Sequence, residues 1–239
     1  MRLCFVSILG QPGTHNPSDY AHLDGGDNEC AWFEHAFDFL PDVTITGCRA
    51  SAGEAPPDPG DGDLFILGGS YNSVHDGYPW QAVIYRWLET LRASGKPLLG
   101  ICGGHQMICH AAGVPVKNLA GGFIAGTEQV RLNEYGRSSP LFSGIAAVAD
   151  FHFGNQEHVT KIPTGARLMA SHDRAPIVAL DHGNGWFSTQ FHPEVTLEAM
   201  QAAWRTSHPQ FVDNFRPSPN GFRLIENFVA MHKGTEGRV

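Results

Sequence analysis

Short apolar runs alternate with segments of helical spacing over the first 113 residues. The runs at 2–10, 43–50, 64–69 and 96–102 predict buried strands. Between them, two segments carry apolar side chains at helical spacing, namely Cys30, Phe33, Phe37 and Leu40 in one and Trp80, Val83, Trp87 and Leu91 in the other. A third helix is expected at 103–113. This alternation predicts a parallel sheet with helices on both faces, and with function at the carboxyl ends of its strands.

The pattern changes after residue 120. The segments 123–134, 166–172 and 176–191 have strand-like composition and turn residues but little helical period, which predicts antiparallel strands attached to the parallel sheet. Helices are expected near 197–207 and 220–232. Because no repeat, low-complexity tract or linker interrupts the chain, we expect a single α/β domain over residues 1–239.

Composition narrows the class of protein. The chain is 42% hydrophobic and 17% charged, and its 24 acidic and 16 basic residues give a net charge of -8, with no basic block to follow a phosphate backbone. We therefore expect no nucleic-acid partner. No apolar stretch is long enough for a membrane span or a secretory leader, and the five scattered cysteines do not suggest a disulfide framework. These features predict a cytoplasmic protein with no membrane association.

Cys102 is a candidate nucleophile. It lies where a buried strand is expected to meet a helix, with Gly100 before it and Gly103 and Gly104 after it. Glycines permit the sharp turn that lifts a nucleophile clear of a sheet, and unpaired N–H groups at a helix start favour the thiolate. Taken alone, the pattern leaves a buried structural cysteine equally open.

The segment 190–196, Gln-Phe-His-Pro-Glu-Val-Thr, decides between these readings. His192 follows an expected strand, and Glu194 lies two residues further on, so both side chains point to the same side of an extended chain. A strand of this kind can aim the imidazole at a thiol while the carboxylate orients it from behind. Cysteine, histidine and glutamate would then form a catalytic triad.

The segments Gly-Ile-Cys-Gly-Gly-His-Gln (100–106) and 190–196 together resemble the paired signature of the class I glutamine amidotransferases, and the resemblance covers nearly the whole chain. It implies a flavodoxin-like fold and release of ammonia from glutamine through a γ-glutamyl thioester. It also implies that Cys102 is the nucleophile, His192 the acid and base, and Glu194 the orienting carboxylate. The segment 68–80 resembles the stand-alone relatives of the amidotransferase half of GMP synthase.

The resemblance further implies an oxyanion hole and a substrate pocket. Backbone N–H groups of Gly69 and Gly103 would hold the oxyanion, each worth roughly 3 to 4 kcal/mol in the transition state. Gln106 would grip the amino acid end of the substrate, with Gly68 beside it. The family has no cofactor or metal in this role.

One segment departs from the family pattern. Many relatives carry a His-Gly-Asp segment where this chain has Phe153, Gly154 and Asn155. Because that segment lines the glutamine pocket largely through its backbone, the three residues are expected to bind substrate, but the preferred amide donor stays open. The chain shows no P-loop or synthetase region, so an ammonia acceptor would be a separate protein, such as a synthetase subunit.

The cysteines and histidines near Cys102 do not predict a metal site. Cys102, His105, Cys109 and His110 are close in sequence, yet on a helix they do not share one face, and no second ligand cluster completes a zinc pattern. Three hypotheses about function therefore stand: hydrolysis of the γ-amide of glutamine, hydrolysis of γ-glutamyl peptides or conjugates without ammonia transfer, and a non-catalytic regulatory homologue. The complete triad favours the first two.

Overall fold

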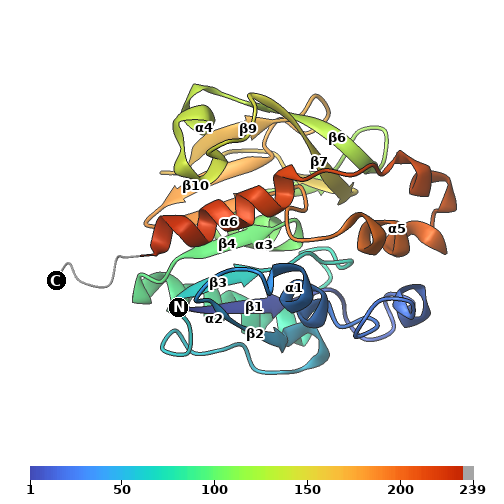
Figure 1. Cartoon of the computed structure of the whole chain (residues 1–239), viewed down its shortest axis with the longest axis horizontal. Coiled ribbons are helices and arrows are strands. Elements are labelled where there is room, and N and C mark those ends of the chain that lie inside the picture. Colours follow the sequence, from blue (N-terminus) through green and yellow to red (C-terminus); the bar gives the residue numbers. More distant parts are fainter. Residues whose placement is uncertain (234–239) are drawn as a thin grey trace.

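The computed structural model describes residues 1–233, and a nine-stranded sheet crosses it in the order β2-β1-β3-β4-β11-β10-β9-β6-β7 (Figure 1). Five neighbouring strands are parallel: β2 (Thr44–Arg49), β1 (Arg2–Ser7), β3 (Leu64–Leu67), β4 (Leu98–Ile101) and β11 (Trp186–Thr189). Antiparallel strands extend this half, namely β10 (Ala179–Gly183), β9 (Arg167–Ser171), β6 (Ile124–Leu132) and β7 (Val148–Asn155). The predicted mixed α/β sheet is confirmed. Strands β5 (Val116–Asn118) and β8 (Glu157–Val159) form a separate antiparallel pair.

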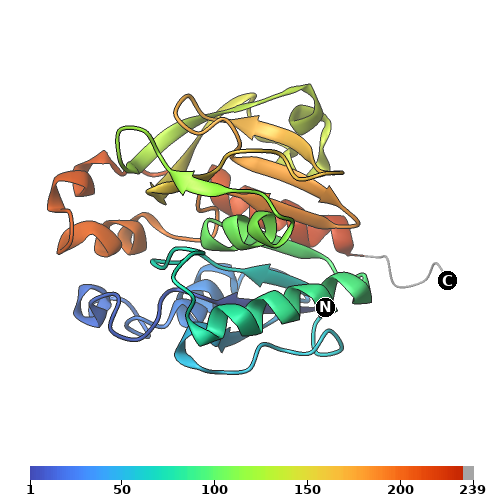
Figure 2. The same ribbon diagram turned by 180° about the vertical axis from the view of Figure 1, so that it is seen from behind.

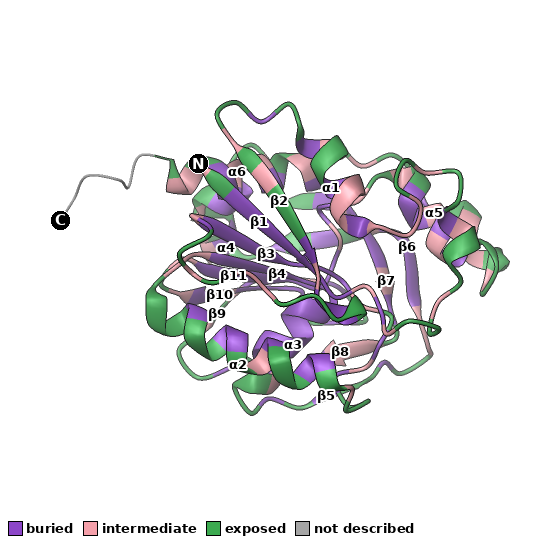
Figure 3. Ribbon diagram, turned by 90° about the horizontal axis from the view of Figure 1, so that it is seen from below, coloured by how far each residue is buried: buried purple, intermediate pink, exposed green. Residues whose placement is uncertain are grey.

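Helices cover both faces of the parallel half. Helices α1 (Glu29–Phe37) and α6 (Asn220–His232) lie on the face seen in Figure 1, and α2 (Pro79–Ser94) and α3 (Gly103–Ala111) lie on the face seen in Figure 2. Strand alternation explains why there are two cores. Leu3 and Phe5 pack with α1 and α6, whereas Cys4 and Val6 pack with α2 and α3. Both faces of the central strands are therefore buried, as Figure 3 shows for β1, β3 and β4.

The buried face of α2 differs from the prediction at one position. Val83 is 37% exposed, whereas Ile84 is fully buried. The inward positions of this helix are Trp80, Ile84, Trp87 and Leu91, which follow the 3.6-residue period more closely than a face that includes Val83. The predicted helix is confirmed, and the assignment of Val83 to its buried face is wrong.

Two chain segments that are far apart in sequence lie together at the carboxyl ends of the parallel strands. These are residues 10–28, which include a short 3-10 helix (Pro17–Tyr20), and α5 (Leu197–Arg205) (Figure 1). A short helix α4 (Glu134–Ser138) packs against β9 away from this end. Among residues 1–233, no helix combines the length and apolar character needed to cross a membrane.

Candidate active site

Cys102 forms the sharp turn between β4 and α3. Its backbone N–H donates a hydrogen bond to the carbonyl of Thr189 at 2.7 Å, and its φ of 49° and ψ of -100° are unusual for a residue with a side chain. The turn is therefore held by the neighbouring strand β11. Cys102 is 4% exposed and lies at the start of α3.

The glycines after Cys102 are required by close packing. A Cβ on Gly104 would lie 2.4 Å from the carbonyl oxygen of Leu67, and one on Gly103 would lie 2.7 Å from the Cβ of Ser70. The first turn of α3 therefore touches the loop after β3 directly. This contact brings Cys102 and the Gly68-Gly69 loop together.

His192 and Glu194 form a buried pair beside the thiol. Nδ1 of His192 lies 2.8 Å from Oε1 of Glu194, and the exposed fractions of these side chains are 12% and 1%. Burial alone lowers the pKa of His192, but the charges of Glu194 and Cys102 outweigh it, so that the pKa lies well above its usual value. The backbone of His192 is fixed as well, because its N–H donates to the carbonyl of His152 at 2.8 Å.

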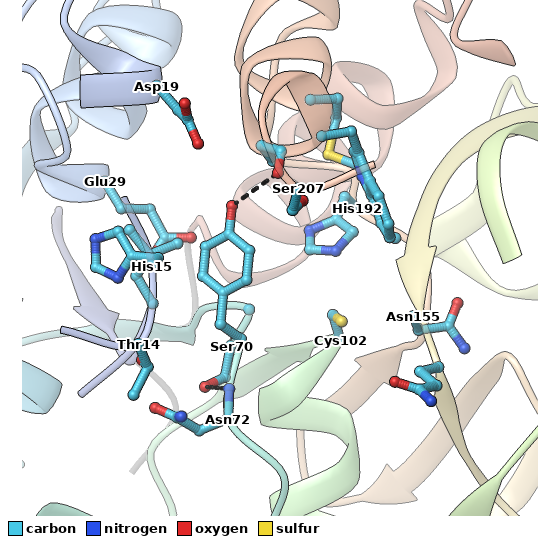
Figure 4. Close-up of a pocket in the computed structure, with 18 of the residues that line it drawn as sticks. Thr14, His15, Asp19, Glu29, Ser70, Asn72, Cys102, Asn155, His192 and Ser207 are labelled. Atoms are coloured by element: carbon cyan, nitrogen blue, oxygen red, sulfur yellow. Dashed lines mark hydrogen bonds between the residues drawn. The ribbon is translucent and has the colours of Figure 1, made fainter. Parts of the chain in front are cut away.

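Gly69 lies against both reacting side chains. A Cβ at this position would be 2.7 Å from Cε1 of His192 and 3.7 Å from Cβ of Cys102. No side chain fits there without displacing the imidazole. The loop after β3, the elbow and the end of β11 thus converge on one point, shown in Figure 4 around Cys102 and His192.

Glu29 is a site residue that sequence reasoning missed. It is the first residue of α1, is 3% exposed, and accepts a hydrogen bond from the hydroxyl of Ser7 at 2.8 Å. Burial and the nearby charge of Glu194 raise its pKa to about 8, while Ser7, His192 and a hydrogen bond from the Gly69 backbone lower it. A second carboxyl group therefore stands behind the triad and contacts the Gly68-Gly69 loop.

Gln190 is a second missed residue, although it lies within the segment that carries His192. Its Nε2 lies 3.6 Å from the sulfur of Cys102, and its Oε1 accepts a hydrogen bond from Nε2 of Gln106 at 3.1 Å. Gln106 also donates to the carbonyl of Glu157 at 2.9 Å. Since a buried glutamine at a strand end is usually a structural residue, nothing in the sequence distinguished Gln190.

Asn155 offers an unused acceptor next to this network. Its Nδ2 donates to the carbonyl of Glu157 at 2.9 Å, while its buried Oδ1 has no hydrogen-bond partner among the described residues. Buried polar atoms are nearly always paired, so this oxygen is suited to a bound ligand. Asn155 and Gln106 both line the cavity that opens at Cys102.

The cavity has a volume of about 870 Å³ and is roofed by residues 10–28 and α5. Two contacts join the two sides of this roof, and a third joins α5 to the loop after β3. The hydroxyl of Thr206 donates to Asp19, the ring of His22 lies 3.6 Å from Glu198, and the hydroxyl of Tyr71 donates to the carbonyl of Ala203 at 3.4 Å. The cavity therefore lies between the N-terminal loop and the helix that follows the triad.

Two of the residues expected in the substrate pocket lie behind the cavity wall. Phe153 is fully buried, and its ring centroid lies 5.2 Å from His172 and 5.9 Å from Phe191. Gly68 packs against the carboxyl group of Glu29. Phe153, predicted to bind substrate through its backbone, is not among the residues that line the cavity, because the alternation of β7 turns its side chain into the core. Gly154 and Asn155 do line the cavity.

The cysteine and histidine residues of α3 are dispersed. Among residues 1–233, no three histidine, cysteine, aspartate or glutamate side chains are grouped so that they could hold a metal ion. His105 is buried with its Nδ1 2.7 Å from the hydroxyl of Ser188, and burial lowers its pKa to about 3. Cys109 lies in the core beneath α2.

Comparisons with known proteins agree with this geometry. The model of the family described as glutamine amidotransferase class-I matches residues 42–207, which is more than half of the chain. The chain is 31% identical over 140 residues to the glutamine-hydrolysing GMP synthase of Azoarcus sp., and 30% identical over 185 residues to that of Allorhizobium ampelinum. These matches cover 55% and 73% of this chain but only 25% and 28% of the relatives. The chain thus spans about a quarter of their length.

Solved structures show the same fold. The crystal structure of SMU.1228c matches with a TM-score of 0.74 at 19% identity, covering 97% of this chain and 99% of that one. A glutamine amidotransferase from Thermotoga maritima matches with a TM-score of 0.72 at 15% identity, covering 97% of both chains. At such identities the likeness concerns the fold alone.

Proposed function

Because the chain belongs to the class-I glutamine amidotransferase family, we propose that it hydrolyses the γ-amide of glutamine through a thioester on Cys102. The observation that carries this proposal is the convergence of Cys102, the His192–Glu194 pair and Gly69 at the mouth of one cavity. No cofactor is required for this chemistry, since the protein supplies nucleophile, acid and base.

In the first half of the reaction, the Cys102 thiolate attacks the γ-carbonyl carbon. The negative charge that develops on the oxygen is held by the backbone N–H groups of Gly103 and Gly69. His192, protonated because its pKa is raised, gives its proton to the departing nitrogen as the amide C–N bond breaks. Ammonia leaves, and the glutamyl group stays on sulfur as a thioester.

In the second half, neutral His192 takes a proton from water, and the resulting hydroxide attacks the thioester. Glutamate leaves and Cys102 is restored as the thiolate. Glu194 keeps the imidazole oriented in both halves, and its charge stabilises the imidazolium. Gln190, 3.6 Å from the sulfur, is placed to donate to the thiolate.

The amino acid end of the substrate lies at the opposite wall of the cavity. The free Oδ1 of Asn155 and the side-chain oxygen of Gln106 are suited to accept hydrogen bonds from the α-ammonium group. Gly154 lies beside them, and Met200 and Trp204 pack where its side chain would be. This assignment gives Asn155 the substrate contact that the family pattern places in this segment.

A second candidate, hydrolysis of larger γ-glutamyl conjugates, is favoured by the volume of the cavity. Both reactions share the same thioester. Where ammonia is the product, a separate synthetase subunit would accept it; the GMP synthase relatives are named as glutamine-hydrolysing synthases. All five cysteines are unpaired, which supports a reducing cytoplasmic setting.

The test is ammonia release from glutamine by the isolated protein, run beside Cys102→Ala and Cys109→Ala. Cys109 is a matched control because it is buried in the same helix but lies away from the cavity. We expect activity to vanish in the first variant and persist in the second. A diazoketone analogue of glutamine should label Cys102 alone in a mass spectrum. Wild-type ammonia release from Cys102→Ala would overturn the proposal.

A further inference from the structure

The cavity is larger than glutamine needs. Its volume of about 870 Å³ lies near the upper end of the roughly 300–1,000 Å³ that enclose drug-sized ligands. The glutamyl group, held by Gln106 and Asn155, occupies one wall. Figure 4 shows Asn155 on one side of Cys102 and His15, Asp19 and Glu29 on the other. A second compartment therefore lies across the thiol from the glutamyl wall.

Aromatic side chains form this second compartment. The rings of His15 and Tyr71 are stacked with centroids 5.5 Å apart, and those of Tyr20 and Trp32 lie 4.7 Å apart. The hydroxyls of Tyr20 and Tyr71 are hydrogen-bonded to each other, and burial raises the pKa of Tyr20 far above its usual value, so both stay neutral. All four side chains line the cavity. Such a wall favours an apolar, flat group.

The α5 side of the cavity is apolar and aromatic as well. Trp204 packs edge to face against Phe123 at 5.2 Å, and His208 lies 4.9 Å from Phe123. A Cβ built on Gly154 would lie 3.2 Å from Cε of Met200 and 3.4 Å from the ring of Trp204. Rings and a thioether therefore also border the cavity beside Gly154.

Charge restricts the ligand further. Among the described residues, the cavity wall contains no lysine or arginine, while Asp19, Glu29 and Glu157 all belong to it. Every γ-glutamyl substrate already brings its α-carboxylate into this cavity, so a carboxylate on the amine portion would add a second anion, beside Asp19, with no positive side chain to pair it, and burying an unpaired charge is costly. The amine portion is therefore not anionic.

We propose that the preferred substrate is a γ-glutamyl amide of an aralkylamine that carries no carboxylate. This inference rests on the proposed function and names its substrate class. The Cys102 sulfur forms a bond to the γ-carbon, the amide C–N bond breaks, and the proton of His192 goes to the nitrogen of the departing aralkylamine. Water then hydrolyses the thioester to glutamate. The ring of the amine lies against Tyr71 and His15.

A matched series of four amides tests the proposal. These are glutamine, γ-glutamyl-ethylamide, γ-glutamyl-2-phenylethylamide and γ-glutamyl-phenylalanine. The second and third differ by the ring, and the third and fourth by one carboxylate. We expect kcat/KM for the phenylethylamide to exceed both the ethylamide and γ-glutamyl-phenylalanine by at least about tenfold, the discrimination typical of a fitted apolar group.

Two variants test which residues cause this substrate preference. Tyr71→Ala should lower the phenylethylamide-to-ethylamide ratio of kcat/KM several-fold, whereas Phe39→Ala, which removes a ring that is 51% exposed and outside the cavity wall, should not. Asp19→Asn should raise the relative rate for γ-glutamyl-phenylalanine. Equal rates for ethylamide and phenylethylamide, or preference for γ-glutamyl-phenylalanine, would overturn this inference. Turnover of glutamine alone would overturn it while leaving the proposed function intact, and turnover of none would overturn both.

Discussion

The imidazole of His192 and the carboxylate of Glu194 are joined by a 2.8 Å contact, and the second oxygen of Glu194 has no hydrogen-bond partner among the described residues. Glu194 therefore depends on His192 alone to compensate its buried charge. Breaking such a pair by removing one partner is costly, because the other charge stays buried. The two residues act as one unit in catalysis and in stability.

Glu194→Gln tests this unit. The amide keeps the shape but removes the charge that raises the pKa of His192, so the histidine loses its proton at lower pH. We expect kcat to fall on the order of a hundredfold or more, and the alkaline limb of the kcat/KM profile to move to lower pH. A pH–rate profile of both proteins checks this. An unchanged alkaline limb would contradict the role of Glu194.

Gly69→Ala tests the close approach of the loop to the triad. The new methyl group would lie 2.7 Å from the His192 ring, so the imidazole must move away from Cys102. We expect kcat to fall about a hundredfold or more with a native circular dichroism spectrum, since a displacement of about 1 Å is enough for such a loss. Gly60→Ala is the control, because a Cβ there meets open space. Equal activity of the two variants would refute the prediction.

Glu29→Gln tests the buried carboxyl group. The folded pKa of about 8 is above the unfolded value, so the folded state holds a proton that the unfolded state releases between about pH 4.5 and 8. The carboxyl group of Glu29 is neutral in the folded and the unfolded state well below pH 4.5. Above that pH the free energy of unfolding falls, and the loss is complete once the pH has risen through 8. We expect the variant to be more stable than wild type at pH 8 and nearly equal at pH 5.

Chemical denaturation at both pH values measures this difference. The raised pKa of His192 makes wild type lose stability in the same direction as pH rises, but His192 is present in both proteins, so the comparison isolates Glu29. Parallel pH dependence of wild type and Glu29→Gln would show that the carboxyl group is already ionised in the folded protein.

Gln190→Leu tests the amide that joins the thiol to the substrate wall. The variant keeps the volume but loses the contacts to the Cys102 sulfur and to Gln106. We expect both a lower kcat and a higher KM for glutamine, each about tenfold, in line with the loss of a hydrogen bond to a charged group. Gln129→Leu, at an exposed position of β6, is the control. If Gln190→Leu kept the kcat and KM of the wild type, the role of Gln190 would be limited to packing.

Local signals in the sequence predicted the parts of the fold and site that depend on backbone geometry. The glycines around Cys102 mark a sharp turn that is visible along the chain, although the loop after β3 that they contact is distant in sequence, and the strand alternation around β1 follows from one buried sheet. Glu29 could not be predicted, because a glutamate in the first turn of a helix is common on any surface. Only the packing of α1 against β1 and the Gly69 loop makes it part of the site.

Phe153 shows a second limit of the sequence. Its place in the family motif predicted a position in the substrate pocket. The direction of its side chain depends, however, on the register of β7 against β6, which pairs Phe153 with Gly126. Pairing between strands that are about 27 residues apart is a tertiary property, and a motif read along one segment does not contain it.

The roof of the cavity is built from residues near both ends of the chain. Asp19 in the N-terminal loop accepts the hydroxyl of Thr206 after α5, and Tyr71 reaches the carbonyl of Ala203 from the loop between them. During synthesis, the thiol and its glycine loop emerge long before α5 does. The nucleophile therefore stays uncovered in the growing chain, and the cavity takes its shape only once α5 has been made and docked.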